Sequence, residues 1–494
     1  MVFNSIIYLL FLLVVTCIYY LFSARWKWIW LLVASIGFYL SFIPVFFGLL
    51  VFIVIVNYFL AKWLAIISDR RNNLALFFII ALDVLVLVFF KYFNNLFPDK
   101  RISLYIVDLF YPVEPINKLI LPLGLSYFIF TLLSYQIEIK RKTIQPEKHL
   151  GYFSLYLLFF PKITQGPIER PQYLIPQLHQ NNILNSTSII EGLKLILWGY
   201  FKKLVVADRL AIYVNAVYNN NSHHNGPSLL VATIFFAFQI YADFSGYTDI
   251  ALGSARLFGI NLTNNFKRPY FSASIKEFWT RWHISLSTWL RDYIFQPIAY
   301  SLSKSINRQK FLFISKDKWI YFIAIMITFS ICGIWHGVGW TYLIWGILFG
   351  VFQTYANWTG GFNKAIRKRL HIKKSSGFYQ AYNVVITFCL LLFTWIFFRS
   401  NTIAEAFSII GKIFSFQGKI FFGETSEVMN SLFHSVIAIF LLMSAEVIKE
   451  YFYDNSSFLK NSNWVIKGLF YASMIVIIIF LGVFDGGQFI YFQF

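Results

Sequence analysis

Charged side chains are scarce in this sequence. Asp, Glu, Lys and Arg make up only 13% of its 494 residues, against about a quarter in soluble proteins. Hydrophobic residues reach 58% and aromatic residues 21%, and apolar stretches of about twenty residues, enough to cross a bilayer, recur along the whole chain. These proportions exclude an ordinary soluble protein. They predict an all-α, polytopic integral membrane protein with roughly ten to twelve spans, together with re-entrant or interfacial helices.

The stretches that qualify as spans, or nearly so, are Phe3–Phe22, Trp26–Phe42, Val45–Leu60, Leu74–Phe93, Ile116–Tyr135, Leu229–Ala242, Trp319–Val338, Tyr342–Trp358, Tyr379–Phe398, Ser431–Leu442 and Val465–Val483. The first of them lacks a basic leading segment and a small-residue cleavage site. It therefore predicts a retained helix rather than a signal peptide.

Cysteine is also rare. Cys17, Cys332 and Cys389 each lie inside an apolar run and show no pairing pattern, so we expect neither a disulfide nor a zinc or other metal site. No internal repeat is visible, which disfavours transporter folds built from duplicated halves.

Acidic residues number 22 against 42 basic ones, which gives a net charge of +20. The basic residues cluster between apolar stretches, at 23–27, 68–71, 140–142 and 363–374. Lys and Arg mark cytoplasmic loops and attract anionic lipid. We therefore expect these basic residues to interact with the anionic surface of the lipid bilayer, and not with nucleic acid. The same rule predicts an N-terminus and a loop at 97–115 outside the cytoplasm.

The pattern predicts a single membrane-embedded domain over residues 1–494 with three zones. Residues 1–145 and 346–494 hold conventional spans, whereas residues 146–345 interrupt their apolar stretches with Gly, Pro and charges. Irregular backbone and ionisable groups persist at membrane depth only when they are buried in protein or line a cavity. A site is therefore expected in the middle zone.

Two segments of the middle zone place charges among apolar residues. "FFPKITQGPIERPQYLIPQL" (159–178) contains four prolines, which prevent one straight spanning helix. It is either a re-entrant loop, in which Glu169 and Arg170 meet other groups, or a surface loop. In 235–260, Asp243 has either a functional or a structural role, and Asp249 and Arg256 are expected to pair near a helix end.

The first of two histidines in tryptophan-rich segments is His283. In "RPYFSASIKEFWTRWHISLSTWLRDYIFQPI" (268–298), Glu277 and Arg281 stand four residues apart and can pair on one helix face. His283 comes two residues after Arg281, among tryptophans typical of a membrane interface. It is either functional or part of an interfacial helix that faces lipid headgroups.

A second histidine, His336, lies in "SICGIWHGVGW" (330–340), inside a run without Asp, Glu, Lys or Arg from 319 to 363. The glycines around it allow close approach of a ligand or of another backbone. Trp335 and Trp340 are expected to shield it from water. From these residues alone, a structural and a catalytic role both stay open.

Four segments in this order resemble the membrane-bound O-acyltransferases, and within them the alginate O-acetylase and peptidoglycan O-acetyltransferase branch. They are 121–142, 159–178, 241–295 and 332–350, and their most specific elements are "EFWTRWHISL" and "GIWHG". The segments 387–407 and 487–494 ("GQFIYFQF") fit the same branch.

The resemblance implies a helical bundle with a passage through it and two histidines near its middle. It implies that His336 is the catalytic residue and His283 the second functional position. The other residues expected at the passage are Trp279, Arg281, Trp282, Trp335, Gly337 and Asp243.

The resemblance also implies a reaction and its participants. The acyl donor is expected to be acetyl-coenzyme A, a substrate from the cytoplasm rather than a bound cofactor. The acceptor is expected to be an exported polysaccharide or cell-wall polymer, reached through an exported serine hydrolase-like partner of the SGNH type. The location is expected to be the bacterial inner (cytoplasmic) membrane.

Transfer from a thioester to a hydroxyl needs a base for the hydroxyl proton, or a nucleophile that carries the acyl group. Neutral imidazole does either, and exclusion of water keeps it neutral and protects the thioester from hydrolysis. We expect His336 to be the general base, and His283 to orient the acceptor or stabilise developing charge.

One departure limits the resemblance. Many relatives follow "WLRDYIF" with a glycine-rich stretch, where this chain has "QPIAYSLSKS" (296–305), so alginate itself is not predicted as the substrate. The alternatives are D-alanyl transfer to teichoic acid by the same fold, a flippase or transporter of a lipid-linked sugar, and a pore or assembly platform.

Overall fold

The computed structural model describes residues 2–42, 44–97, 119, 121–306, 310–312, 314–423, 425–452 and 463–484. Except for Phe97, the expected outside loop at 97–115 lies outside these residues, as does the segment 487–494. Most of the described chain is helical, and its strands form a two-stranded antiparallel sheet of β1 (Lys310–Phe311) and β2 (Ile314–Ser315). The predicted all-α class is confirmed.

Within the described ranges, seven helices are long and apolar enough to cross a membrane. They are built on α3 (Phe47–Ile66), α4 (Asp69–Leu96), α11 (Gly226–Arg256), α15 (Lys316–His336), α17 (Gly377–Arg399), α19 (Ser426–Val447) and α21 (Trp464–Leu481). Helix α1 (Ile6–Leu21) is apolar but shorter, with 16 residues. The chain is therefore a multi-pass membrane protein, as predicted.

The chain forms two compact units. The first comprises Met1–Gly199 with Tyr247–Asn264, and the second comprises Tyr200–Gly246 with Asn265–Phe494. Helix α11 contributes residues to both units. Each unit is described separately below.

Helix α6 (Leu125–Lys140) is the most buried element of the first unit and packs against α3, α4, α7 and α8. The amide of Asn57 donates to Asp83 at 2.9 Å, and Gln136 donates to Asn57 at 3.0 Å. Polar groups at membrane depth must be satisfied within the protein. This buried chain of hydrogen bonds therefore joins α3, α4 and α6. The other helices of the unit are α2 (Ala24–Leu40), η1 (Pro44–Phe46), α7 (Leu150–Leu158), α8 (Pro171–His179) and most of α9 (Ser186–Tyr200).

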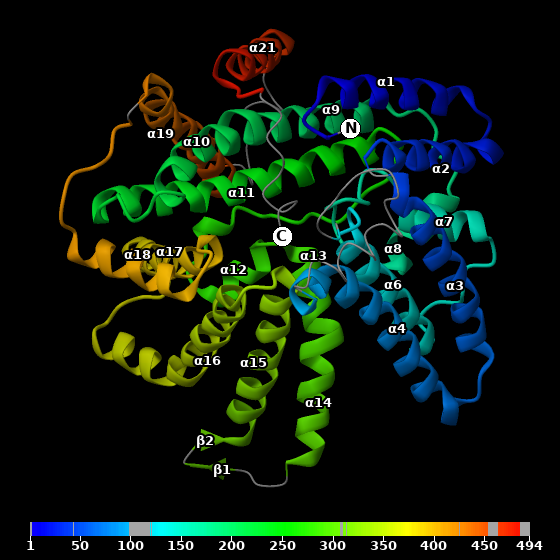
Figure 1. Ribbon diagram of the computed structural model, residues 1–494, viewed down its shortest axis with the longest axis horizontal. Helices are drawn as coiled ribbons and strands as arrows, with labels where there is room; N and C mark the ends of the chain where they lie inside the picture. The colour runs from blue at the N-terminus through cyan, green and yellow to red at the C-terminus, as the bar shows by residue number, and fades with distance from the viewer. Residues whose placement is uncertain are drawn as a thin grey trace. The chain divides into compact units, whose positions relative to one another are not determined.

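The second unit contains a hairpin of α15 and α16 (Trp340–Arg369), with α14 (Gln296–Ser305) beside α15 (Figure 1). A Cβ atom on Gly333 would lie 2.4 Å from the carbonyl oxygen of Tyr342, and one on Gly346 would lie 2.2 Å from that of Phe329. These glycines therefore let the two backbones touch. The stretch 296–305, where the chain departs from the family pattern, is the helix α14.

The other elements of the second unit are short or irregular. They are η2 (Phe201–Ala207), α10 (Asp208–Tyr218), η3 (Pro269–Phe271), α12 (Ile275–Arg281), α13 (Ile284–Leu290), η4 (Arg291–Phe295), α18 (Ile403–Ser415) and η5 (Ile448–Phe452).

Candidate functional site

The proline-rich loop at 159–170 is buried in the first unit, so the surface-loop alternative is wrong. The Glu169 carboxylate accepts hydrogen bonds from the backbone N–H of Thr263 at 2.5 Å and from its hydroxyl at 3.1 Å. Burial raises the pKa of Glu169 to about 7 and lowers the pKa of the nearby Lys162 to about 8. Elsewhere in this unit, Arg256 forms an ion pair with Glu191 at 2.8 Å, a partner that was not predicted from the sequence.

His283 lies in the second unit at the junction of α12 and α13. Its φ of 42° is in the left-handed region, which non-glycine residues adopt rarely and often at functional sites. Its exposed fraction is 0%. The alternative in which His283 faces lipid headgroups is therefore wrong.

Asn265 organises the backbone and side chain at His283. Its Oδ1 atom accepts hydrogen bonds from the backbone N–H and the hydroxyl of Ser285, at 3.0 and 2.9 Å, and lies 3.2 Å from Nδ1 of His283. Its carbonyl oxygen accepts from the N–H of Ile284 at 2.9 Å. Asn265 was not predicted from the sequence, although it lies in one of the segments that carry the family resemblance.

The buried imidazole of His283 has a strongly perturbed acid–base equilibrium. Burial lowers its pKa to about 3, because a charged imidazolium is poorly solvated away from water. At neutral pH the ring is therefore uncharged. One ring nitrogen can donate a hydrogen bond while the other accepts one.

Two lysines on the π-helical turn η2 bind the segment of α11 next to His283. Lys203 contacts Asp243 at 2.7 Å and Asp208 at 2.8 Å, and Lys202 donates to the hydroxyl of Ser245 at 3.0 Å. The structure thus gives Asp243 an ion-pair partner, Lys203, that was not predicted from the sequence. Burial is the main reason that the pKa of Asp208 rises to about 7. Phe244, between the two bound residues, packs its ring 4.7 Å from that of His283.

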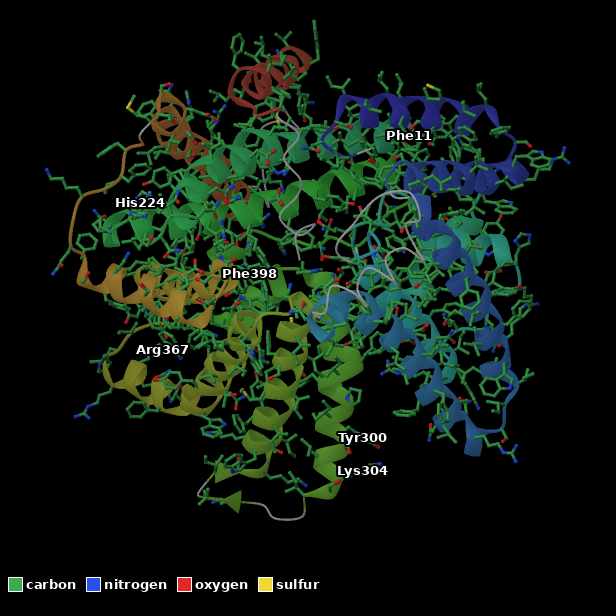
Figure 2. All side chains as sticks on the ribbon, in the orientation of Figure 1. Phe11, His224, Tyr300, Lys304, Arg367 and Phe398 are labelled. Carbon is green, nitrogen blue, oxygen red and sulfur yellow. The ribbon has the colours of Figure 1, made fainter. Side chains whose placement is uncertain are left out.

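His336 is the last residue of α15 and is only 4% exposed. Its ring lies 4.8 Å from that of Trp345 and 5.5 Å from that of Phe398, measured between centroids. Phe398 stands near the end of α17, beside the α15–α16 hairpin (Figure 2). Trp340 is 72% exposed, so the expectation that it shields the histidine is wrong. Trp345, five residues later on α16, packs against His336 instead.

The space beside Gly337 is filled by protein. A Cβ atom on Gly337 would lie 2.2 Å from the ring of Tyr342. Gly333 and Gly337 therefore serve the close packing of α15 against α16, and the room beside Gly337 is taken by the Tyr342 ring.

Trp335 lies near both histidines. Its ring centroid is 4.6 Å from that of His336 and 6.4 Å from that of His283. The structure thus brings the two histidines predicted as functional to one aromatic neighbour. This proximity was not deducible from either motif alone.

Trp279, Arg281 and Trp282 differ in their surroundings. Arg281 pairs with Glu277 at 2.7 Å, as predicted, and also with Glu450 at 2.7 Å. Trp282 is buried, with its ring 5.4 Å from Phe278. Trp279 borders a cavity of about 490 Å³.

That cavity runs along α15 between Tyr321 and Phe329 and is lined largely by apolar groups. Its charged lining residues are Lys276 and Arg291, and its hydroxyl groups come from Thr280, Ser287, Thr288, Thr328 and Tyr321. The Trp279 ring on its wall lies 6.0 Å from the Trp345 ring, which in turn packs against His336. Aromatic rings therefore link the cavity to His336.

These features define a multi-pass helical membrane protein with two buried histidines that share one tryptophan neighbour. The model of the MBOAT, membrane-bound O-acyltransferase family matches residues 17–399. The chain belongs to this family and is an O-acyltransferase.

The chain is similar to relatives whose names state the reactions that those relatives catalyse. The chain is 31% identical over 422 residues to "Probable alginate O-acetylase AlgI" of Azotobacter vinelandii, covering 84% of this chain and 78% of that protein. It is 28% identical over 522 residues to the peptidoglycan O-acetyltransferase of Helicobacter pylori, covering 94% and 91%. It is 28% identical over 255 residues to the teichoic acid D-alanyltransferase of Bacillus subtilis, covering 51% and 63%.

Proposed function

We propose that this protein passes an acetyl group from cytoplasmic acetyl-coenzyme A across the bacterial inner membrane, for O-acetylation of an exported polysaccharide or cell-wall polymer. An exported serine hydrolase-like partner of the SGNH type completes the transfer. The main support is similarity over most of the chain to relatives named as O-acetylases, together with two buried histidines that share the neighbour Trp335.

The 490 Å³ cavity suits the donor. Lys276 and Arg291 can bind the phosphates of coenzyme A, and the apolar wall suits its pantetheine arm. Helix α15, which lines this cavity from Tyr321 onward, begins with Lys316 and Lys318. Basic residues at the end of a span favour the cytoplasmic side. The donor therefore enters from the side on which coenzyme A is found.

In the proposed reaction, an acceptor hydroxyl attacks the thioester carbonyl. A C–O bond forms and the C–S bond breaks. The imidazole of His336 takes the hydroxyl proton and returns it to the leaving thiolate. His283, uncharged and held near Asn265, orients the acceptor or donates a hydrogen bond to the oxyanion. Burial of both rings keeps water from hydrolysing the thioester.

Transfer of D-alanine from a carrier protein is the second candidate, because a teichoic acid D-alanyltransferase is also similar. That similarity covers 51% of this chain, against 84% and 94% for the O-acetylating relatives. Acetyl transfer is therefore favoured.

A transfer assay with the purified protein in proteoliposomes, its partner and a polymer acceptor distinguishes the two donors. Radiolabelled acetyl-coenzyme A should yield ester-linked acetate, and a D-alanyl carrier protein should yield no ester. A Lys276→Ala/Arg291→Ala variant should raise the KM for acetyl-coenzyme A about tenfold or more, whereas Lys304→Ala, on the exposed face of α14, should leave it unchanged. Transfer from the carrier protein alone would contradict the proposal.

A further inference from the structure

A loop ahead of α12 pairs with the segment that carries His283. The N–H of Lys267 donates to the carbonyl oxygen of Arg281 at 2.9 Å, and the N–H of Ile284 donates to the carbonyl oxygen of Asn265, also at 2.9 Å. These two bonds lie on either side of His283, whose backbone is in the left-handed region. The loop therefore holds the backbone before and after the histidine.

The side-chain amide of Asn265 is oriented by Ser285. Its Oδ1 atom accepts from the backbone N–H of Ser285 at 3.0 Å and from the hydroxyl at 2.9 Å. A backbone N–H can only donate, so an amide turned the other way would place its NH₂ group against another N–H. At the opposite end of the amide, Nδ2 is buried and has no hydrogen-bond partner within the described ranges. Ser285 therefore decides which atom of Asn265 faces His283.

That oxygen decides which ring nitrogen of His283 carries the hydrogen. Oδ1 of Asn265 lies 3.2 Å from Nδ1 of the imidazole. An amide oxygen only accepts hydrogen bonds, so Nδ1 is the donor and carries the hydrogen. The uncharged ring has one such hydrogen, and Nε2 therefore carries a lone pair.

Two phenyl rings restrict the imidazole from other directions. The Phe244 ring stands 4.7 Å away with 88° between the planes, and the Phe266 ring stands 6.5 Å away with 29° between the planes. A phenyl ring has no nitrogen or oxygen that could compete with Asn265 for Nδ1. The two rings and the amide together fix the plane of the imidazole and the position of its hydrogen.

We propose that Asn265 is a positioning residue that holds His283 in the tautomer with its hydrogen on Nδ1, so that Nε2 accepts a hydrogen bond from a hydroxyl group of the acyl acceptor. The inference rests on the proposed function and decides between the two roles given to His283 there. The ring orients the acceptor, and Nε2 donates no hydrogen bond to the oxyanion. Asn265 acts through His283, and His336 stays the base.

The tautomer is measured by ¹⁵N NMR of the full-length protein in lipid nanodiscs at neutral pH, with its 8 histidines labelled. A ring nitrogen that carries a hydrogen and one that carries a lone pair give separate signals. The signals that are absent from His283→Gln belong to His283. We expect its hydrogen on Nδ1. Asn265→Leu, which has a similar size and no oxygen, should lose this preference, whereas Asn264→Leu, at the exposed position before it, should keep it.

The acetyl-transfer assay in proteoliposomes measures the consequence for the reaction. Asn265→Leu should lower kcat at least about tenfold, because a histidine in the wrong tautomer is a poor participant in acyl transfer. The KM for acetyl-coenzyme A should change less than about twofold, since Asn265 is not among the residues that line the 490 Å³ cavity. Asn265→Asp keeps an oxygen for both Ser285 and Nδ1, and should restore a large part of kcat together with the hydrogen on Nδ1.

Two variants of His283 test the role of the lone pair. The amide oxygen of His283→Gln can accept a hydrogen bond in place of Nε2, whereas His283→Met fills a similar volume and has only a weak acceptor. His283→Gln should therefore transfer acetyl groups faster than His283→Met, at equal abundance in the membrane.

Three results would overturn the inference. They are a hydrogen on Nε2 of His283 in the natural protein, a kcat of Asn265→Leu no lower than that of Asn264→Leu, and equal transfer by His283→Gln and His283→Met. If Asn265→Leu does not fold, the spectrum of the natural protein and the activity of Asn265→Asp decide. The spectrum needs neither donor nor acceptor. A hydrogen on Nδ1 without transfer from acetyl-coenzyme A therefore contradicts only the proposed function, and transfer with the hydrogen on Nε2 contradicts only this inference.

Discussion

The rings of Phe244 and His283 stand almost perpendicular, with centroids 4.7 Å apart and 88° between their planes. Phe244 is flanked by Asp243 and Ser245, which are bound by Lys203 and Lys202. The π-helical turn that carries both lysines is a feature often found at functional sites. The position of the His283 imidazole therefore depends on buried charges on another helix.

Removing the Lys203 ammonium should destabilise the protein strongly. Lys203→Met leaves Asp243 buried without its cation, and breaking a buried pair in this way costs about 3–5 kcal/mol. The midpoint of thermal unfolding in detergent should fall markedly. It should recover in part in Lys203→Met/Asp243→Asn, in which the unpaired charge is also removed. Lys194→Met, at an exposed position on α9, is the control, and an equal loss there would contradict the account.

The glycines of the α15–α16 hairpin give a second prediction with a matched control on one helix. Gly346→Ala places a methyl group 2.2 Å from the carbonyl oxygen of Phe329, whereas nothing lies within 4 Å of a Cβ atom at Gly360. Gly346→Ala should therefore lower the unfolding midpoint and the transferase activity. Gly360→Ala should keep both or raise the midpoint, because alanine favours a helix by about 1 kcal/mol over glycine. Equal behaviour of the two variants would refute this packing.

The lowered pKa of His283 predicts acid destabilisation. Between pH 6.5 and about 3 the unfolded chain holds a proton at this ring that the folded protein does not. Stability is therefore lost as the pH falls through 6.5, by at most about 1.4 kcal/mol per pH unit. A series of unfolding midpoints from pH 7.5 to 4 should show a smaller acid loss for His283→Gln than for the natural protein. Parallel curves would contradict the buried, neutral ring.

Glu169 should change the stability of the fold with pH in the direction opposite to His283. Its pKa rises to about 7 on folding, so the folded protein holds a proton that the unfolded chain has lost between pH 4.5 and 7. Stability from this group therefore falls as the pH rises through that interval. Glu169→Gln keeps an oxygen for the Thr263 N–H and lacks the charge. Its unfolding midpoint relative to the natural protein should increase from pH 4.5 to pH 8, and a constant difference would count against the assignment.

Local features were predictable from the sequence, and distant pairings were not. The apolar runs located α3, α4, α15 and α17, because a spanning helix must be apolar along its length. The pairing of Glu277 with Arg281 follows from helical spacing alone.

The partners of the two histidines come from other parts of the chain. Asn265 reaches His283 through the path of the loop before α12, and Trp345 reaches His336 only because α16 folds back on α15. The prediction that Trp340 covers His336 was wrong because Trp340 begins α16 on an exposed face. Such contacts depend on tertiary packing, which periodicity and composition do not encode.

The most direct test of the account is the ester-linked acetate on the exported polymer of cells that lack this gene. Complementation with the natural sequence should restore the acetate. His336→Ala, at equal abundance in the membrane, should lower it at least about 100-fold, as expected for loss of a general base, and His283→Ala should be similarly or partly defective. Full acetylation by His336→Ala would contradict the central claim.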